Sequence, residues 1–199
     1  QWYVEAMVNG AWQGLSAPAT FAVISPGFTS TFDSNSNGWQ QLNGNWALNS
    51  TGAYKSMGVI GKLSSTMRQA QVLNNYVYEV TMKRKVEPDS FNQIIIQGMP
   101  SPSGSNQNWN TGYYFGYYNN GSWGFWRRNG DDSTTLLYDS VATPFVNPYG
   151  YNKLTVWTNY PYIYAWINEA FIGIVSDTDY QSGSIGGGFW RKNADASPP

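Results

Sequence analysis

Apolar and polar residues alternate with a period of two along most of the sequence, and this pattern constrains the fold more than any other feature. In the run 76–84, apolar side chains recur at Tyr78, Val80 and Met82, and the residues between them are polar. An extended chain places such alternate residues on opposite faces. No window shows the sustained spacing of three and four residues that an amphipathic helix needs. The pattern therefore predicts half-buried antiparallel strands.

Short turn sequences separate these runs and predict hairpins. The segment Asn119-Asn120-Gly121-Ser122 lies between the runs 112–118 and 123–128. Asn and Gly tolerate the positive φ angles that tight hairpin turns require. Further hairpins are predicted to join the runs 154–158, 162–167 and 171–175 in order. Many short strands at this spacing predict an all-β fold, an antiparallel β-sandwich or jelly roll.

The composition excludes several classes of function. The 199 residues include no Cys and no His. A Ser-His-Asp triad, a thiol nucleophile and the ordinary zinc, haem and iron–sulfur sites are therefore excluded. The formal net charge is −1, which gives no basic surface for nucleic acid. No apolar run approaches the length of a transmembrane helix, so membrane insertion is not expected.

The first 27 residues differ from the rest. The runs 2–8 and 17–23 are predicted to be strands, Asn9-Gly10 is a turn signal, and residues 25–27 form a linker. Two strands cannot bury a core alone, so this β-hairpin extension needs a partner sheet. That partner is the main domain, a preceding domain, or another copy of the chain. The predicted division is therefore an N-terminal two-strand segment, 1–27, and a β-sandwich, 28–199.

Short motifs follow one another in a fixed order between residues 28 and 193. They are Phe32-Asp33, Gly38-Trp39, Gly44-Asn45-Trp46, the strand 76–82, Gly112-Tyr113-Tyr114-Phe115, Asn152-Lys153-Leu154, Ile167-Asn168, and Asp177 with Tyr180, Gly183 and Ile185. In the order and spacing of these motifs the chain resembles bacterial laminin-G-like, concanavalin A-like β-sandwich modules. The resemblance implies a jelly-roll sandwich. Residues 1–23 resemble the last two strands of a fibronectin-type-III-like domain.

Aromatic residues make up 17% of the chain and occur on both faces of predicted strands. In the hairpin 112–128, Tyr114 and Tyr118 share one face of their strand. In the partner strand Trp126 lies on the opposite face from Trp123. A core on one side of a sheet requires only one aromatic face. The second face is therefore a candidate platform on which a sugar ring stacks.

Two tryptophans outside this hairpin extend the candidate site. Leu154 and Val156 point to one face of their strand, so Trp157 points to the other. Trp109 lies in the polar loop 100–110, where it would close over one end of the platform. The candidate ligand-binding residues are Trp109, Tyr114, Tyr118, Trp123, Trp126 and Trp157.

The carboxylates give no convincing catalytic or metal site. Glycoside hydrolysis needs two carboxylates across a cleft, and the Glu-x-Asp-x-x-Glu strand motif of related sandwich glucanases is absent. We expect no catalytic residue and no cofactor. The pair Asp177 and Asp179 is a weak signal for Ca²⁺, and turn chemistry explains the same two residues.

Three functions remain open. The first is a non-catalytic extracellular or cell-surface module for binding or adhesion, with a polysaccharide or glycan as partner. The second is a structural subunit of an extracellular filament or sheath, in which the N-terminal strands of one copy pair with a sheet edge of the next. The third is a glycan-active enzyme. The candidate assembly residues for the second function are Trp2, Tyr3, Val4, Phe21 and Val23.

Overall fold

A computed structural model describes residues 6–8, 11–13, 27–32, 36, 38–50, 52–56, 61–68, 72–83, 91–100, 109–131, 133–140 and 143–191. Every regular element among these residues is a β-strand, and none of them forms a helix that is long and apolar enough to cross a membrane. The chain divides into two compact units, residues 1–30 and 31–199.

The first unit contains one described pair of strands. Strand β1 (Ala6–Val8) pairs antiparallel with β2 (Ala11–Gln13), with Met7 opposite Trp12. This pair flanks the predicted turn at Asn9-Gly10. The second predicted strand, 17–23, lies outside the described residues, as do the candidate assembly residues Trp2, Tyr3, Val4, Phe21 and Val23. Their role stays a prediction.

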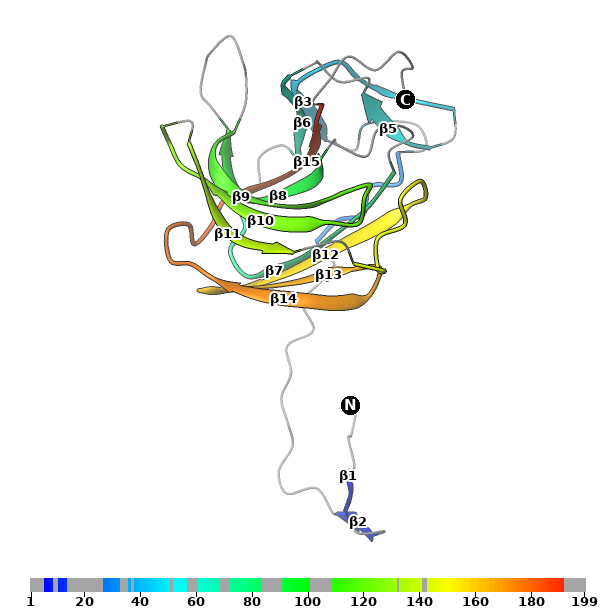
Figure 1. Ribbon diagram of the computed structural model, residues 1–199, viewed down its shortest axis with the longest axis vertical. Helices are drawn as coiled ribbons and strands as arrows, with labels where there is room; N and C mark the ends of the chain where they lie inside the picture. Colours follow the sequence, from blue (N-terminus) through cyan, green and yellow to red (C-terminus); the bar gives the residue numbers. More distant parts are fainter. Residues whose placement is uncertain are drawn as a thin grey trace. The chain divides into compact units, whose positions relative to one another are not determined.

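The second unit is built on a seven-stranded antiparallel sheet, which curves in Figure 1 from the green strands up to β3, β6 and β15. In spatial order its strands are β11 (Thr134–Ser140), β10 (Trp123–Arg128), β9 (Trp109–Tyr118), β8 (Phe91–Pro100), β15 (Ser184–Trp190), β6 (Leu63–Arg68) and β3 (Trp39–Asn43).

A four-stranded antiparallel sheet forms the second layer, below the first in Figure 1. Its order is β14 (Ala170–Ser176), β13 (Tyr162–Ile167), β12 (Asn152–Asn159) and β7 (Tyr76–Met82). A separate hairpin joins β4 (Trp46–Leu48) to β5 (Tyr54–Ser56). The predicted hairpins β9–β10, β12–β13 and β13–β14 are all confirmed. The all-β jelly-roll sandwich is confirmed with them.

The main core lies between the two sheets and follows the period-two pattern. Phe115 and Phe125 of the large sheet are fully buried, as are Leu154 and Val156 of the small one. Hydrogen bonds also cross the layers. The Tyr78 hydroxyl of β7 donates to the Gly186 carbonyl of β15 at 3.1 Å. Alternation therefore sends one face of each strand into this shared core.

The other face of the seven-stranded sheet carries a second apolar cluster. We call it the concave face; it is the face turned away from the four-stranded sheet. Its buried members are Leu63, Ile95, Trp109 and Tyr114, and Leu42, Met67 and Trp126 pack against them. Glycines make room for the Trp109 indole, because a Cβ on Gly98 or Gly186 would lie 2.5 or 2.3 Å from its ring atoms. The large sheet therefore carries buried apolar residues on both faces.

We expect Gly186→Ala to destabilise the fold. The added methyl would overlap Trp109 and a backbone oxygen of Thr66, and overpacking of this kind costs about 1–3 kcal/mol. The neighbouring Gly187→Ala is a matched control, because a Cβ there meets no atom within 4 Å. Urea unfolding of both variants tests this prediction. Equal stability of the two variants would contradict the packing described above.

Alkaline pH should also destabilise the fold. Burial raises the pKa of Tyr76, Tyr78 and Tyr113 above the ordinary value of 10.0. A raised pKa in the folded state leaves stability intact below pH 10 and removes it as the pH rises further, because the unfolded chain ionises first. Each buried phenol then lowers the free energy of unfolding by about 1.4 kcal/mol per pH unit. Urea unfolding at pH 8, 10 and 11 measures this fall, which should be shallower in Tyr78→Phe. A free energy of unfolding that is the same at pH 8, 10 and 11 would contradict it.

Candidate functional site

The strand register places the predicted aromatic faces of the β9–β10 hairpin as expected. Trp123 lies opposite Tyr117 and Phe125 opposite Phe115, while Trp126 lies opposite Tyr114. The first two pairs face the four-stranded sheet. The Trp126–Tyr114 pair faces the concave side, so the predicted division of this hairpin into two aromatic faces is confirmed.

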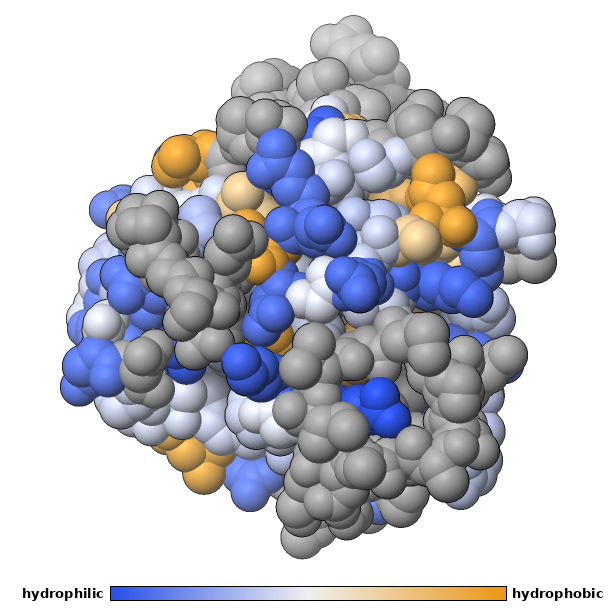
Figure 2. Space-filling view, turned by 90° about the horizontal axis from the view of Figure 1, so that it is seen from above, coloured by the Kyte–Doolittle hydropathy of each residue, from blue (hydrophilic) through white to orange (hydrophobic). Residues whose placement is uncertain are grey.

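The concave face brings together four of the candidate ligand-binding residues, but its centre is closed. Trp109 is fully buried and Tyr114 is 6% exposed. At its margin, Phe91 packs against Tyr118 at 4.7 Å and against Trp126 at 4.6 Å between ring centroids. Figure 2 shows that the coloured surface on this side is mostly hydrophilic, with separate hydrophobic patches. Trp109 and Tyr114 therefore stabilise the curved sheet and are not part of an open platform, whereas Tyr118 and Trp126 are half-buried at its margin.

Trp123 also serves packing. Its indole is 4% exposed and stacks on Tyr138 of the edge strand β11, with centroids 5.0 Å apart and planes 12° apart. It meets Phe115 edge to face at 6.3 Å. Trp123 therefore stabilises the contact of β10 with β11 and the inner core.

Trp157 is the candidate residue that faces solvent. Its side chain is 41% exposed, whereas Leu154 and Val156 of the same strand are fully buried. The predicted outward direction of Trp157 is therefore confirmed. It lies on the outer face of the four-stranded sheet, which the main core leaves uncovered.

Further aromatic side chains lie beside Trp157 on this outer face. Tyr164 is its cross-strand partner in β13, and Trp166 of β13 lies opposite Phe171 of β14. Tyr162 begins β13 on the same face and is 45% exposed, and Phe171 is 51% exposed. We call this set the aromatic row; it comprises Trp157, Tyr162, Tyr164, Trp166 and Phe171.

Ring contacts order the aromatic row. Trp157 and Tyr164 stack with centroids 4.8 Å apart and planes 22° apart. Tyr164 and Trp166 are 6.4 Å apart with planes 25° apart, and Phe171 is tilted by 57° against Trp166. Tyr164 covers one face of the Trp157 indole. The cross-strand neighbour of Trp157 on the other side is Val77 of β7, a smaller residue that is 63% exposed.

Polar groups border the aromatic row on the same face. The Glu79 carboxylate accepts hydrogen bonds from Lys153 Nζ at 2.8 Å and from Thr155 Oγ1 at 3.0 Å. The bond from Lys153 lowers the pKa of Glu79, and the same bond raises the pKa of Lys153. Both groups stay charged at neutral pH and leave a nearly balanced, hydrogen-bonding margin.

The candidate residues predicted from the sequence do not include Tyr162, Tyr164, Trp166 and Phe171. A signal was present in the run Tyr162-Ile163-Tyr164-Ala165-Trp166-Ile167, where every second residue is aromatic and every other one is a smaller apolar residue. In a strand this pattern commits the aliphatic residues to the core and the rings to the opposite face.

Asp177 and Asp179 bind an arginine. Arg127 Nη1 lies 2.7 Å from Asp177 Oδ2 and 2.5 Å from Asp179 Oδ2. The Tyr113 hydroxyl donates to Asp177 Oδ1 at 2.7 Å, and burial together with this bond raises the pKa of Tyr113. Among the described residues, no group of three Asp, Glu, His or Cys side chains is placed to hold a metal ion. A Ca²⁺ ion at this pair would have to displace Arg127.

The described strands of the two sheets carry few carboxylates. Within the described ranges, Asp139 of β11 is the one carboxylate in the seven-stranded sheet and Glu79 of β7 is the one in the four-stranded sheet. Glu79 is bound to Lys153. The described strands thus offer no pair of carboxylates on one face for acid and base catalysis.

Comparisons with known proteins show the fold. No protein-family model matches the chain, and no curated protein matches it in sequence. Solved structures that resemble it include the carbohydrate binding module CBM66 from Bacillus subtilis, with a TM-score of 0.59 and 14% identity over 79% of this chain and 93% of that one. A Bacillus licheniformis β-glucanase matches with a TM-score of 0.57 and 13% identity over 83% of this chain and 85% of its own.

A third similar structure is a protein of unknown function with a galectin-like fold, also from Bacillus subtilis. Its TM-score is 0.57, with 11% identity over 81% of this chain and 87% of that one. At these identities the likeness extends to the fold and not to the function.

We expect Ca²⁺ to leave the stability of the protein unchanged. Arg127 already neutralises Asp177 and Asp179, so a cation gains little there. Thermal unfolding in 5 mM Ca²⁺ and in excess chelator tests this prediction, because a ligand of the folded state raises the unfolding temperature. A higher midpoint with Ca²⁺ that disappears in Asp177→Asn would contradict it and would establish a metal site.

The 31–199 unit thus carries the aromatic row on the outer face of its four-stranded sheet. The ion pair between Glu79 and Lys153 borders the row.

Proposed function

We propose that this chain is a non-catalytic carbohydrate-binding module that acts outside the cell or on its surface and binds a glycan on the aromatic row. The observation that carries the proposal is the exposure of stacked aromatic rings on an ordered strand face. An aromatic face packs well against the C–H groups of a sugar ring, and the polar margin bonds its hydroxyls. Exposed apolar surface of this kind marks an interaction site more often than a structural one.

The comparisons support the same class of partner. The similar structures include one described as a carbohydrate binding module and one described as a β-glucanase. A jelly-roll sandwich is thus a scaffold on which carbohydrate recognition occurs. The laminin-G-like identity of residues 28–193 belongs to this proposal, and it rests on the order of the sequence motifs.

The choice of the outer face over the concave face follows from access. A ligand can contact only those rings that are accessible to solvent in the free protein. Trp109 and Tyr114 are nearly or fully buried, whereas Trp157 and Phe171 are about half exposed. Binding to the outer face needs no rearrangement of the sheet, and preorganised surfaces bind with less loss of conformational entropy.

Two alternatives compete with this proposal. A glycan-active enzyme is one, since a glucanase is among the similar structures. The described strands do not favour an enzyme, because each of the two sheets carries a single carboxylate in its described strands. A filament or sheath subunit is the other, and its assembly residues lie outside the described ones.

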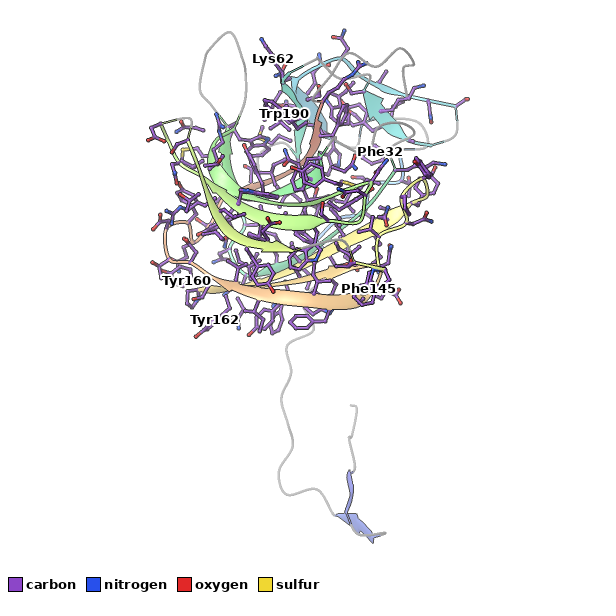
Figure 3. The ribbon with its side chains drawn as sticks, in the orientation of Figure 1. Phe32, Lys62, Phe145, Tyr160, Tyr162 and Trp190 are labelled. Atoms are coloured by element: carbon purple, nitrogen blue, oxygen red, sulfur yellow. The ribbon has the colours of Figure 1, made fainter. Side chains whose placement is uncertain are left out.

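The binding prediction compares two tryptophans of equal exposure. Trp157 is 41% exposed in the aromatic row, and Trp190 is 43% exposed at the end of β15 in the other sheet. Figure 3 shows Trp190 on the opposite side of the sandwich from Tyr162 of the row. Because a central aromatic contact contributes more than about 1.4 kcal/mol, Trp157→Ala should weaken polysaccharide binding at least tenfold. Trp190→Ala should leave it unchanged.

Affinity electrophoresis and pull-down with cellulose, chitin, xylan, β-1,3-glucan and fructan provide the measurement. Unfolding midpoints of both variants establish that they are folded. A loss of binding confined to Trp190→Ala would place the site on the seven-stranded sheet instead. No binding to any polysaccharide would refute the proposal. Release of reducing sugar by the wild-type protein would favour the enzyme.

A further inference from the structure

A network of asparagine side chains holds the loop 143–151, which leads into β12. Asn152 Nδ2 donates to the Asn147 carbonyl at 2.8 Å, and the Asn147 amide donates to Asn152 Oδ1 at 2.7 Å. The Gly150 amide donates to Asn147 Oδ1 at 3.0 Å. Val146 is 6% exposed and anchors the loop in the core. Compact loops that satisfy their own backbone in this way are ordered and often functional.

This ordered loop presents aromatic rings to solvent. Phe145 is 44% exposed, Tyr149 is 65% exposed and Tyr151 is 64% exposed. The Lys83 ammonium lies 5.3 Å from the centroid of the Tyr151 ring, which adds a cation at the same place. Such exposure adds little to folding stability, because burial is what makes aromatic side chains stabilising. Exposed rings on an ordered loop are instead suited to contact with a ligand.

The loop is bonded to the end of the aromatic row. Asn168 Nδ2 donates to the Phe145 carbonyl at 2.7 Å and to Asn152 Oδ1 at 2.8 Å. Asn168 lies in the turn that joins Trp166 of β13 to Phe171 of β14. Figure 3 shows Phe145 at one end of the four-stranded sheet and Tyr160 and Tyr162 at the other. Exposed rings therefore occur at both ends of this sheet.

We infer that the loop and the aromatic row form one elongated site for an extended polysaccharide chain, bound at internal sugar units and not at its end. This inference rests on the proposed function. From Tyr162 to Trp166 the row spans four residue steps, about 13 Å. Phe145 lies beyond the Trp166 end, where its carbonyl accepts a bond from Asn168. An elongated ligand contacts more of the rings than a short one does. A chain end or a single sugar would be recognised better by a closed pocket with converging polar groups.

Oligosaccharides of increasing length test the inference. The probes are cello-, laminari-, xylo- and fructo-oligosaccharides of two, four and six units, measured by isothermal titration calorimetry. Affinity should rise at each step up to six units. Phe145→Ala and Tyr149→Ala should each lower the affinity for the six-unit ligand about tenfold and leave that for the two-unit ligand unchanged. Both side chains are exposed and the Phe145 carbonyl is retained, so the fold should survive. Trp190→Ala is the matched control.

The results separate this inference from the proposed function. If Trp157→Ala abolishes binding while the loop variants and ligand length have no effect, the elongated site is wrong and carbohydrate binding on the row stands. If four and six units bind equally, the loop is outside the site. If the wild-type protein binds no oligosaccharide or polysaccharide, both are wrong.

Discussion

Packing of the two sheets through alternate side chains determines the position of every other feature. In β12 and β13 the residues Leu154, Val156, Ile163 and Ala165 are buried against the large sheet. Because side chains of a strand alternate strictly between faces, burial of these residues forces their neighbours outward. Trp157, Tyr164 and Trp166 lie on the outer face for that reason, with Trp157 exposed and the other two half-buried. A shift of one residue in the register would bury the rings and expose the aliphatic residues, so the core and the candidate site are fixed together.

Polar side chains reinforce this packing at the end of the sandwich. Tyr113 of β9 and Arg127 of β10 both bind Asp177, which follows β14 of the other sheet. The Asp177 side chain is 8% exposed, and a buried carboxylate without a cation partner is strongly destabilising. The ion pair therefore connects the loop after the small sheet to strand β10 of the large one. The same two acidic residues that suggest a cation site in the sequence have a structural role here.

Local patterns in the sequence predicted the strands, the hairpins and the outward direction of Trp157, because alternation and turn chemistry act over a few residues. They did not predict that Trp109 and Tyr114 are buried. Their burial depends on the curvature of the seven-stranded sheet and on the approach of β3 and β6, which are distant in sequence. The Arg127–Asp177 pair joins residues 50 positions apart, and no local pattern indicates it. The alternation in residues 162–167 does indicate the outward rings of β13, whereas the many rings of the β9–β10 hairpin indicate a face whose centre is buried in the fold.

The stacking within the aromatic row bears on how such a surface binds. A flexible side chain loses rotamer freedom when a ligand immobilises it, and that loss lowers affinity. In this protein Trp157, Tyr164 and Trp166 hold one another nearly parallel before any ligand arrives. Their freedom is lost during folding, where the cross-strand contacts compensate for it. Only 12% of the residues in the chain are charged, and the charges beside the row are paired to one another. The free-energy cost of removing water from charged groups is therefore small when an uncharged sugar binds. Rigid rings and a balanced margin thus make an exposed strand face suited to binding, even though it forms no deep cleft.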